Sequence, residues 1–519
     1  MKNIFIIALA TIVFTLTFSA CNEFLGENPV VFYSEESVFA TEEGVETAVN
    51  GMYASLSSGA YYGTSWHNLI MPHSGKFFST QVANRDVTGL NATSSNTWIN
   101  DLWSQAYQTI NVANTLIENL ENTTVSLNNR ETALGNAYFL RGVAYFDLVN
   151  LFGGVPLRST PTTIDNIHLP RASKEAVIQQ IIADWKKAET MMPEPGNTTN
   201  ARPSRLAANV CLAKLYMVLA GGDNGNPAYW EKAKTELLPV INSGAFRLAP
   251  TYAELFTPGN ENTVESIFEI QYGHTGGIRN SDIVRSFTPS NSLFAPANAV
   301  TFGRLRPNKE TFDQHVAQYP GDPRIAATFL FGQYERLDGV IQKIYPDKKT
   351  GNTGFPYIRK WFDPGYNGTT TERNLILLRY ADVLLMMAEI ENEISGPDNA
   401  YSFVNQVLTR ARDTNGDGIS DAAQPADWSN MTKDDFRLRI MQERYYELLS
   451  EGQDWLDSRR RGFDFFLQEI VAKHNGHTYF DATTDFVYPM SDKNKLLPIP
   501  LSEISGNQAI SNSDQNPGY

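Results

Sequence analysis

The sequence predicts a mostly α-helical protein, a tetratricopeptide-like scaffold of helix hairpins that carries long irregular loops. Three observations lead to this fold class. Apolar residues recur at spacings of three and four in several segments, the pattern of a helix with one face against a core. These segments come in pairs joined by short polar connectors, and two long stretches without helical periodicity interrupt the series.

Helix hairpins are expected near residues 98–150, 173–243, 379–412 and 432–452. In the first hairpin, one apolar stripe runs from Ile99 to Leu120 and the next from Leu134 to Leu148, with a polar connector over 122–130. Repeated hairpins are typical of tetratricopeptide-like solenoids, although here the spacing is irregular and the repeat consensus is absent.

The first twenty residues have the pattern of an export signal. Lys2 precedes an apolar run that ends at Phe18, and two small residues then lead to Cys21. The run is shorter than the roughly 20 residues that a spanning helix needs. Small residues directly before a Cys resemble the lipobox of bacterial lipoproteins. Cys21 is therefore expected to be the lipidated first residue of the mature chain, because several acyl chains anchor a protein firmly; a soluble exported protein is the alternative.

Residues 21–519 are expected to form one domain. With 42% hydrophobic and 12% aromatic residues, the chain can bury a large core, and no Ser/Gly-rich linker divides it. Besides Cys21 the chain has only Cys211, which is expected to pack in the core. The formal charge of -15 works against nucleic acid as a partner. It also mildly disfavours a polyanionic ligand, although a local basic pocket can exist on an acidic protein.

Two loop-rich stretches, 59–96 and 271–371, are rich in Gly, Asn, Ser, Thr, Pro and aromatic residues. Loops this long are uncommon in a compact domain and are usually functional. Ligand binding is therefore expected in these stretches rather than on the packed helices. The alternative is surface elaboration without a function.

Motifs along the chain resemble those of SusD/RagB-like outer-membrane lipoproteins. The most specific one is 137–157, an Arg-x-x-x-Tyr-Phe helix followed by Gly-Gly-Val-Pro. Further matches are Cys21–Leu25, Arg202–Ser204, Leu378–Glu389, Glu451–Trp455, Leu497–Pro500 and Gln515–Tyr519. The resemblance spans almost the whole chain and implies a SusD-like fold. Its departures concentrate in the two loop-rich stretches, so it leaves the ligand open.

The charged residues of these motifs are interpreted as structural rather than catalytic. Arg141 and Glu389 lie on or beside apolar stripes, where a charge is tolerated only when it is paired and hydrogen-bonded. Pairing between residues four apart on one helix is expected to account for a second set, which is Glu443, Arg444, Glu447 and Glu451.

The loop-rich stretches also offer the side chains that sugar recognition needs. Flat aromatic faces cover the apolar side of a pyranose, while amide, carboxylate and guanidinium groups bind its hydroxyls. The candidate glycan-binding residues are Tyr61, Tyr62, Trp66, His67, Asn84, Arg85, Asp86, Asn96 and Trp98, with a second aromatic cluster at Trp361, Phe362 and Tyr366. Trp103, on the inner stripe of a helix, is expected to belong to the core instead.

One run resembles the start of a calcium loop. Asp413, Asn415 and Asp417 fit Asp-x-Asn-x-Asp-Gly, and Asp421 follows. An EF-hand has a bidentate Glu at the twelfth position, where this chain has Gln424. Two interpretations stay open: a weak, partly hydrated structural Ca²⁺ site, or a plain turn after the preceding helix. No cofactor is expected to be required.

The sequence contains no nucleophile elbow, phosphate loop or zinc-ligand spacing. The resemblance therefore implies a nonenzymatic lipoprotein at the outer-membrane surface. It would bind poly- or oligosaccharide and act as a lid over a SusC-like TonB-dependent transporter. The alternatives are a peptide-binding lid of the RagB kind and, from another class, a surface glycoside hydrolase.

Overall fold

The computed structural model describes residues 35–81, 85–196, 201–273, 281–368 and 371–519, so the predicted signal peptide and Cys21 lie outside the described residues. The predicted mostly α-helical fold is confirmed. The long helices that the apolar periodicity predicts are all present: α6 (Thr97–Asn122), α7 (Arg130–Phe152), α8 (Lys174–Met191), α9 (Arg205–Ala220), α10 (Ala228–Asn242), α14 (Tyr380–Ser395), α15 (Pro397–Arg412) and α16 (Lys433–Leu448).

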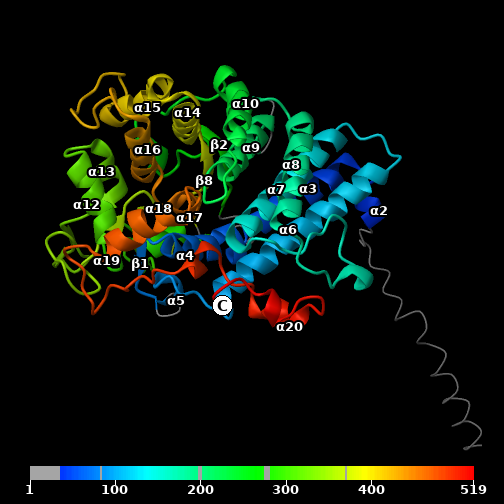
Figure 1. The fold of residues 1–519 in the computed structure, drawn as a ribbon, viewed down its shortest axis with the longest axis horizontal. Coiled ribbons are helices and arrows are strands. Elements are labelled where there is room, and N and C mark those ends of the chain that lie inside the picture. Colours follow the sequence, from blue (N-terminus) through cyan, green and yellow to red (C-terminus); the bar gives the residue numbers. More distant parts are fainter. Residues whose placement is uncertain (1–34, 82–84, 197–200, 274–280, 369–370) are drawn as a thin grey trace, which may run out of the picture.

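Consecutive helices pack against one another, as in a tetratricopeptide-like arrangement. The closest pairs are α6 with α7, α7 with α8, α9 with α10, and α14 with α15. In Figure 1 these helices follow an arc from α6–α8 through α9 and α10 to α14–α16. One helix that the periodicity does not single out, α3 (Glu42–Leu56), packs on α6 and α7. None of the helices in the described ranges is both long enough and apolar enough to cross a membrane.

The contact between α7 and α8 depends on a glycine. A Cβ on Gly142 would lie 2.4 Å from Nε1 of Trp185. The absent side chain lets the indole of Trp185 lie directly on the α7 backbone, where Nε1 donates to the Phe139 carbonyl at 3.1 Å. Trp103 of α6 is buried as predicted, with its ring edge-to-face against Phe152 at 4.9 Å.

The first loop-rich stretch is not irregular throughout. It begins with a π-helical turn, η1 (Gly59–Gly63), and continues with the helix α4 (Ser65–His73), whose nine residues are all buried. The prediction of a loop is wrong here because a helix buried on all sides has no apolar stripe to reveal its period. The stretch also contains β1 (Phe77–Ser79) and α5 (Arg85–Thr88).

The second loop-rich stretch consists of short elements: α11 (Ile283–Phe287), β3 (Leu305–Pro307), α12 (Lys309–Gln318), α13 (Pro323–Thr328), β4 (Phe329–Leu330), β5 (Gln333–Glu335), β6 (Ile341–Lys343) and β7 (Tyr357–Ile358). Two strands flank the stretch, β2 (Ser266–Ile270) before it and β8 (Leu375–Arg379) after it. The remaining C-terminal helices include α17 (Asp454–Arg459), α18 (Phe463–Phe466), α19 (Lys473–Asn475) and α20 (Leu501–Gly506).

The strands form antiparallel pairs, of which one joins the two loop-rich stretches. β1 pairs with β3, with Phe77 opposite Pro307 and Ser79 opposite Leu305. The other pairs are β2 with β8, β4 with β7, and β5 with β6. Segments more than 200 residues apart in the sequence are thus held at hydrogen-bonding distance, which brings their loops to one region of the surface.

A network of buried ion pairs lies where the helices meet the strands. Glu447 of α16 binds Arg324 of α13 at 3.0 Å, Arg379 of β8 at 2.7 Å, and Arg410 of α15. Arg379 and Arg410 both also bind Glu265, at 2.7 and 2.8 Å. All five side chains are buried. Burial by itself raises the pKa of Glu447, but the three guanidinium groups outweigh it and hold that pKa well below its ordinary value.

The prediction that pairs within one helix account for the charges of 443–451 is wrong. Glu443 binds Arg324 at 2.6 Å, and Arg444 binds Asp382 at 2.7 Å and Asp457 at 2.9 Å. These partners lie on other elements, so the charges join elements to one another instead of stabilising a single helix.

The pairing predicted for Arg141 and Glu389 is confirmed. Arg141 binds both carboxylate oxygens of Asp184, at 2.8 and 2.6 Å. Glu389 accepts from Arg460 at 2.7 and 2.6 Å. Both charges therefore sit in the core with their hydrogen-bonding capacity largely used.

Replacing Glu447 by Ala is expected to lower the free energy of unfolding by about 3 to 5 kcal/mol, because three buried guanidinium groups lose a shared carboxylate. Urea unfolding measures the loss. The control is Glu194→Ala, which removes a pair with Arg205 whose side chains are 31% and 58% exposed and should cost at most about 1 kcal/mol. Equal losses in the two variants would contradict the central role of the network.

Candidate functional site

Three of the predicted glycan-binding aromatic residues form a buried cluster. The rings of Tyr61 and Tyr62 stack at 4.5 Å, and Trp66 lies 4.7 Å from Tyr62. Both tyrosine hydroxyls donate to one carboxylate oxygen of Asp147 on α7, at 2.5 and 2.6 Å. The hydroxyls thus anchor η1 to the helical scaffold.

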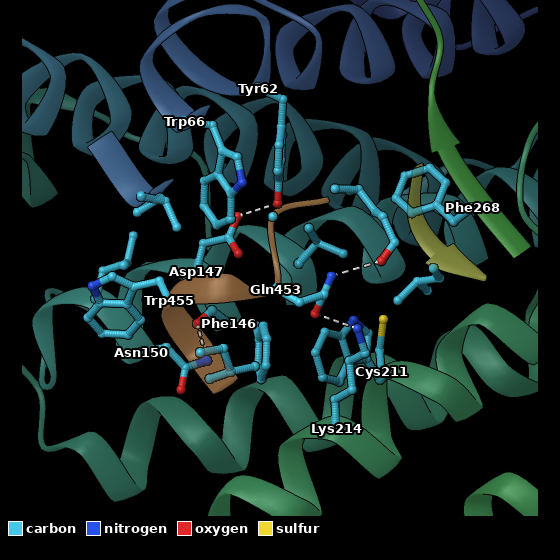
Figure 2. Close-up of a pocket in the computed structure, with 18 residues that line it drawn as sticks. Tyr62, Trp66, Phe146, Asp147, Asn150, Cys211, Lys214, Phe268, Gln453 and Trp455 are labelled. Carbon is cyan, nitrogen blue, oxygen red and sulfur yellow. Dashed lines mark hydrogen bonds between the residues drawn. The ribbon is translucent and has the colours of Figure 1, made fainter. Parts of the chain in front are cut away.

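A cavity of about 80 Å³ lies beside this cluster, between α4, α7, α9 and the turn that leads into α17 (Figure 2). Trp66 and Phe268 belong to its mostly apolar lining, and Gln453 enters from the turn, where it accepts from Lys214 at 2.7 Å. Roughly 150 Å³ is the volume of a cavity that accepts benzene. The cavity is therefore too small for a pyranose.

The second predicted aromatic cluster is also buried. Trp361 is 1% exposed, and its Nε1 donates to Oγ of Ser450 at 3.1 Å. Phe362 packs against Phe294 at 4.8 Å, and the Tyr366 ring is covered by protein.

The remaining candidates lie around the start of α6. Asn96 caps this helix by accepting from the amides of Trp98 and Ile99, and it donates to Asp86. Asp86 also accepts from the amides of Val87 and Thr93, so its role is local. Trp98 packs partly against the core, Arg85 is exposed, and Asn84 lies outside the described residues.

The expectation that Tyr61, Tyr62, Trp66, Trp361 and Tyr366 offer exposed faces is therefore wrong. In a chain this long, aromatic residues between the hairpins extend the core beneath the loops. Residue type and lack of periodicity do not distinguish this role from that of an exposed platform. Two of the buried candidates, His67 and Tyr366, nevertheless lie beside a surface region that the sequence does not single out.

This region is where the two loop-rich stretches meet. Nε2 of His67 lies 2.6 Å from one carboxylate oxygen of Asp282, and Arg304 binds the other. The carbonyl of Gly63 accepts from the Asp282 amide and from the Ser281 hydroxyl, both at 3.0 Å. Burial raises the pKa of Asp282, but His67 and Arg304 outweigh it and lower that pKa below its ordinary value.

An exposed aromatic ring and a second guanidinium complete the region. Phe302 is 40% exposed, and its amide donates to the Arg285 carbonyl at 2.8 Å. The guanidinium carbons of Arg285 and Arg304 lie 4.3 and 5.5 Å from the Phe302 ring centroid. Burial raises the pKa of Tyr366, and the nearby charges of Arg285 and Asp282 shift it in opposite directions. We call Asp282, Arg285, Phe302, Arg304 and Tyr366 the loop junction.

Polar atoms of the loop junction have unused hydrogen-bonding capacity. Among the described residues, the buried Nε of Arg285 has no acceptor and the Tyr366 hydroxyl has no partner. The buried Oε1 of Gln81, which follows β1, is likewise without a donor in the described chain. Such groups cost free energy when they stay unpaired, and a polar ligand can satisfy them.

A glycine sets the geometry of the Phe302–Arg304 segment. Gly303 has φ of +50°, and a Cβ there would lie 2.6 Å from the Tyr357 ring and 2.9 Å from Cα of Pro289. Only glycine fits this turn without displacing its neighbours. The Phe-Gly-Arg triplet is thus the sequence signal that could have identified this part of the surface.

A larger pocket of about 620 Å³ lies elsewhere, between η4 (Ala253–Phe256), the 293–294 segment and residues 359–364. Its size suits a ligand, but its buried polar groups are already engaged. The Tyr252 hydroxyl contacts Thr328 and Glu447, and Nζ of Lys360 donates to Glu451 and two carbonyls. The loop junction, by contrast, has buried polar atoms without a partner among the described residues.

The calcium-like run forms one wall of this pocket through Asp413 and Thr414. The carboxylate of Asp413 accepts from the amides of 415, 416 and 418, and Asp421 accepts from Thr414. No group of three or more acidic, His or Cys side chains suited to a metal occurs in the described residues. This arrangement fits a self-contained turn, which is one of the two interpretations that the sequence leaves open.

Comparison with known proteins places the chain. The SusD family model matches residues 264–519, and a model described as "Starch-binding associating with outer membrane" matches residues 23–217. SusD-like protein P2 of Formosa agariphila is 30% identical over 535 residues, which cover 98% of each chain. The chain belongs to the SusD family.

Other SusD-family structures share this fold. A SusD homolog from Bacteroides thetaiotaomicron has a TM-score of 0.79 at 22% identity, covering 95% of this chain and 100% of that one. A laminarin binding SusD-like protein has a TM-score of 0.70 at 21% identity, and the match covers 92% of this chain and 100% of that one.

The carboxyl that holds Tyr61 and Tyr62 should make stability depend on pH. Burial raises the pKa of Asp147 from 3.8 to about 7. A folded-state pKa above the unfolded value means that this carboxyl stabilises the fold while it is protonated, and that stability is lost as pH rises from about 4 to about 7. Asp147→Asn cannot ionise. The difference in the free energy of unfolding, variant minus wild type, should therefore be larger at about pH 8 than at about pH 5 by on the order of 3 kcal/mol. Urea unfolding at both pH values measures the difference, and a difference independent of pH would contradict the assignment.

Proposed function

We propose that this SusD-family chain is a cell-surface lipoprotein that binds poly- or oligosaccharide and delivers it to a SusC-like TonB-dependent transporter of the outer membrane. The observation that carries the proposal is the loop junction. There an exposed aromatic ring stands beside guanidinium and hydroxyl groups that have no partner among the described residues.

The groups of the loop junction match the chemistry of a sugar. The exposed part of the Phe302 ring can cover the apolar face of a pyranose, while the guanidinium of Arg285 can bind the hydroxyls at its edge. The laminarin binding SusD-like protein shares the fold and supports a glycan as the ligand class. Loops positioned by a rigid scaffold are also where binding sites usually lie.

A binding role is favoured over hydrolysis. A glycosidase needs two carboxyl groups about 5 to 9.5 Å apart across the sugar. The loop junction contains one carboxylate, Asp282, and that group is occupied by His67 and Arg304. The chain is therefore proposed to capture glycan and leave its cleavage to other proteins.

Replacing Phe302 by Ala should lower glycan affinity about 5- to 100-fold while leaving thermal stability nearly unchanged, because loss of a stacking ring costs roughly 1 to 3 kcal/mol by analogy with base stacking. Trp361→Ala is the matched control. It should lower stability by about 3 to 5 kcal/mol, because its ring is buried in the core.

Isothermal calorimetry on a panel of polysaccharides and unstructured peptides gives the affinities, and a reducing-end assay follows the same mixtures. Binding to peptides alone would favour the peptide-binding lid. Release of reducing ends by the purified protein would favour a hydrolase. Unchanged affinity in Phe302→Ala would refute the placement of the site.

Replacing Cys21 by Ala should release the protein from the membrane without changing its fold, because Cys21 precedes every helix of the described scaffold. Membrane fractionation, mass spectrometry of the N-terminus and circular dichroism test this expectation. Outer-membrane retention of a variant without acyl chains would refute lipid anchoring.

A further inference from the structure

We infer that the loop junction selects an acidic glycan, one whose sugars carry carboxylate or sulfate groups, and that Arg285 binds the anionic group. The inference rests on the proposed function, since it concerns the ligand class of the same surface. The observation behind it is a partly buried cation, Arg285, that has no ion-pair partner among the described residues and lies next to an exposed aromatic ring.

Buried arginines of this chain are mostly paired with acids. Six of the eight buried arginines among the described residues bind one or more carboxylates: Arg141, Arg324, Arg379, Arg410, Arg444 and Arg460. The other two, Arg306 and Arg373, donate to backbone carbonyls instead. The half-buried guanidinium of Arg285 has neither kind of partner among the described residues: it lies 4.3 Å from the Phe302 ring centroid, and its buried Nε has no acceptor there. The chain itself therefore does not supply the anion that the packing elsewhere provides.

The partly exposed guanidinium of Arg285 suits an oxyanion. Two nitrogens of a guanidinium form a planar fork that binds two oxygens of a carboxylate or sulfate at once. A neutral sugar hydroxyl would satisfy one of these donors but would not neutralise the charge.

The local charge balance favours an anion although the whole chain is acidic. The five residues of the loop junction contribute two guanidinium charges and one carboxylate, a balance of plus one, and the carboxylate of Asp282 already serves Arg304 and His67. Asp363 also acts on Tyr366, but it accepts from the Gly365 amide. The formal charge of -15 is spread over the molecule, and salt screens it beyond about 8 Å. Direct contacts at the junction therefore decide the preference.

The test uses a panel of neutral and acidic polysaccharides with intact, lipid-free protein. The neutral probes are laminarin, dextran, starch and xyloglucan, and the acidic probes are polygalacturonate, alginate, chondroitin sulfate and carrageenan. The best acidic probe should bind at least about tenfold more tightly than its carboxyl-reduced or desulfated derivative, since a charged hydrogen bond contributes about 1.5 to 3 kcal/mol. Whether the carboxylated or the sulfated probes bind identifies the anionic group.

Arg285→Gln should weaken binding of that probe about 10- to 100-fold and remove most of the salt dependence, with thermal unfolding confirming the fold. Arg247→Gln is the matched control: it removes the same charge from an exposed position outside the loop junction and outside the larger pocket and should leave affinity unchanged. Tight binding to a neutral glycan, with Arg285→Gln binding as wild type, would overturn the inference and leave the proposed function standing. Binding to none of the polysaccharides would overturn the proposed function itself.

Discussion

The buried carboxylate of Glu447 is the point on which the architecture depends. It is shared by guanidinium groups from α13, α15 and β8, and none of these cations could be buried alone. A buried charge is tolerated only with a partner in good geometry, so the elements that carry these residues must meet. Two residues of the second loop-rich stretch take part in buried ion pairs with the segment that contains Glu447: Arg324 binds Glu443, and Lys360 binds Glu451. The same ion pairs that join the helices therefore also hold parts of the second loop-rich stretch.

Use of aromatic residues follows from that arrangement. Between the hairpins the chain must cover the ion-pair network and exclude water from it, and the rings of Trp361, Tyr252 and Phe256 pack around Lys360 and its acceptors. Rings that are buried in this way cannot contact a ligand. The aromatic surface left for binding is consequently small, and recognition must draw on polar groups as well. A surface with one exposed ring and free hydrogen-bonding groups is what this division of roles produces.

The sequence predicts the helical scaffold well because amphipathic periodicity is a local property. It predicts α6–α10 and α14–α16 but not α4, which is buried on every side. Sequence periodicity does not predict the partners of charged residues. Glu443 follows helical spacing, yet it binds Arg324, which lies 119 residues earlier. The same limit applies to the site. Aromatic content points to the same stretches as the proposed loop junction, but burial of Trp361 and exposure of Phe302 depend on long-range packing. The loop junction also depends on the pairing of β1 with β3, of which the local Phe-Gly-Arg triplet gives no sign.

The three-residue ladder between β1 and β3 has an evolutionary consequence. It fastens both loop-rich stretches at one point, with backbone hydrogen bonds that do not depend on side-chain identity. Arg285 and Phe302 lie outside this ladder, so substitutions there leave its backbone hydrogen bonds in place. Under the proposed function, point changes at the loop junction can therefore alter specificity while the inherited scaffold stays the same.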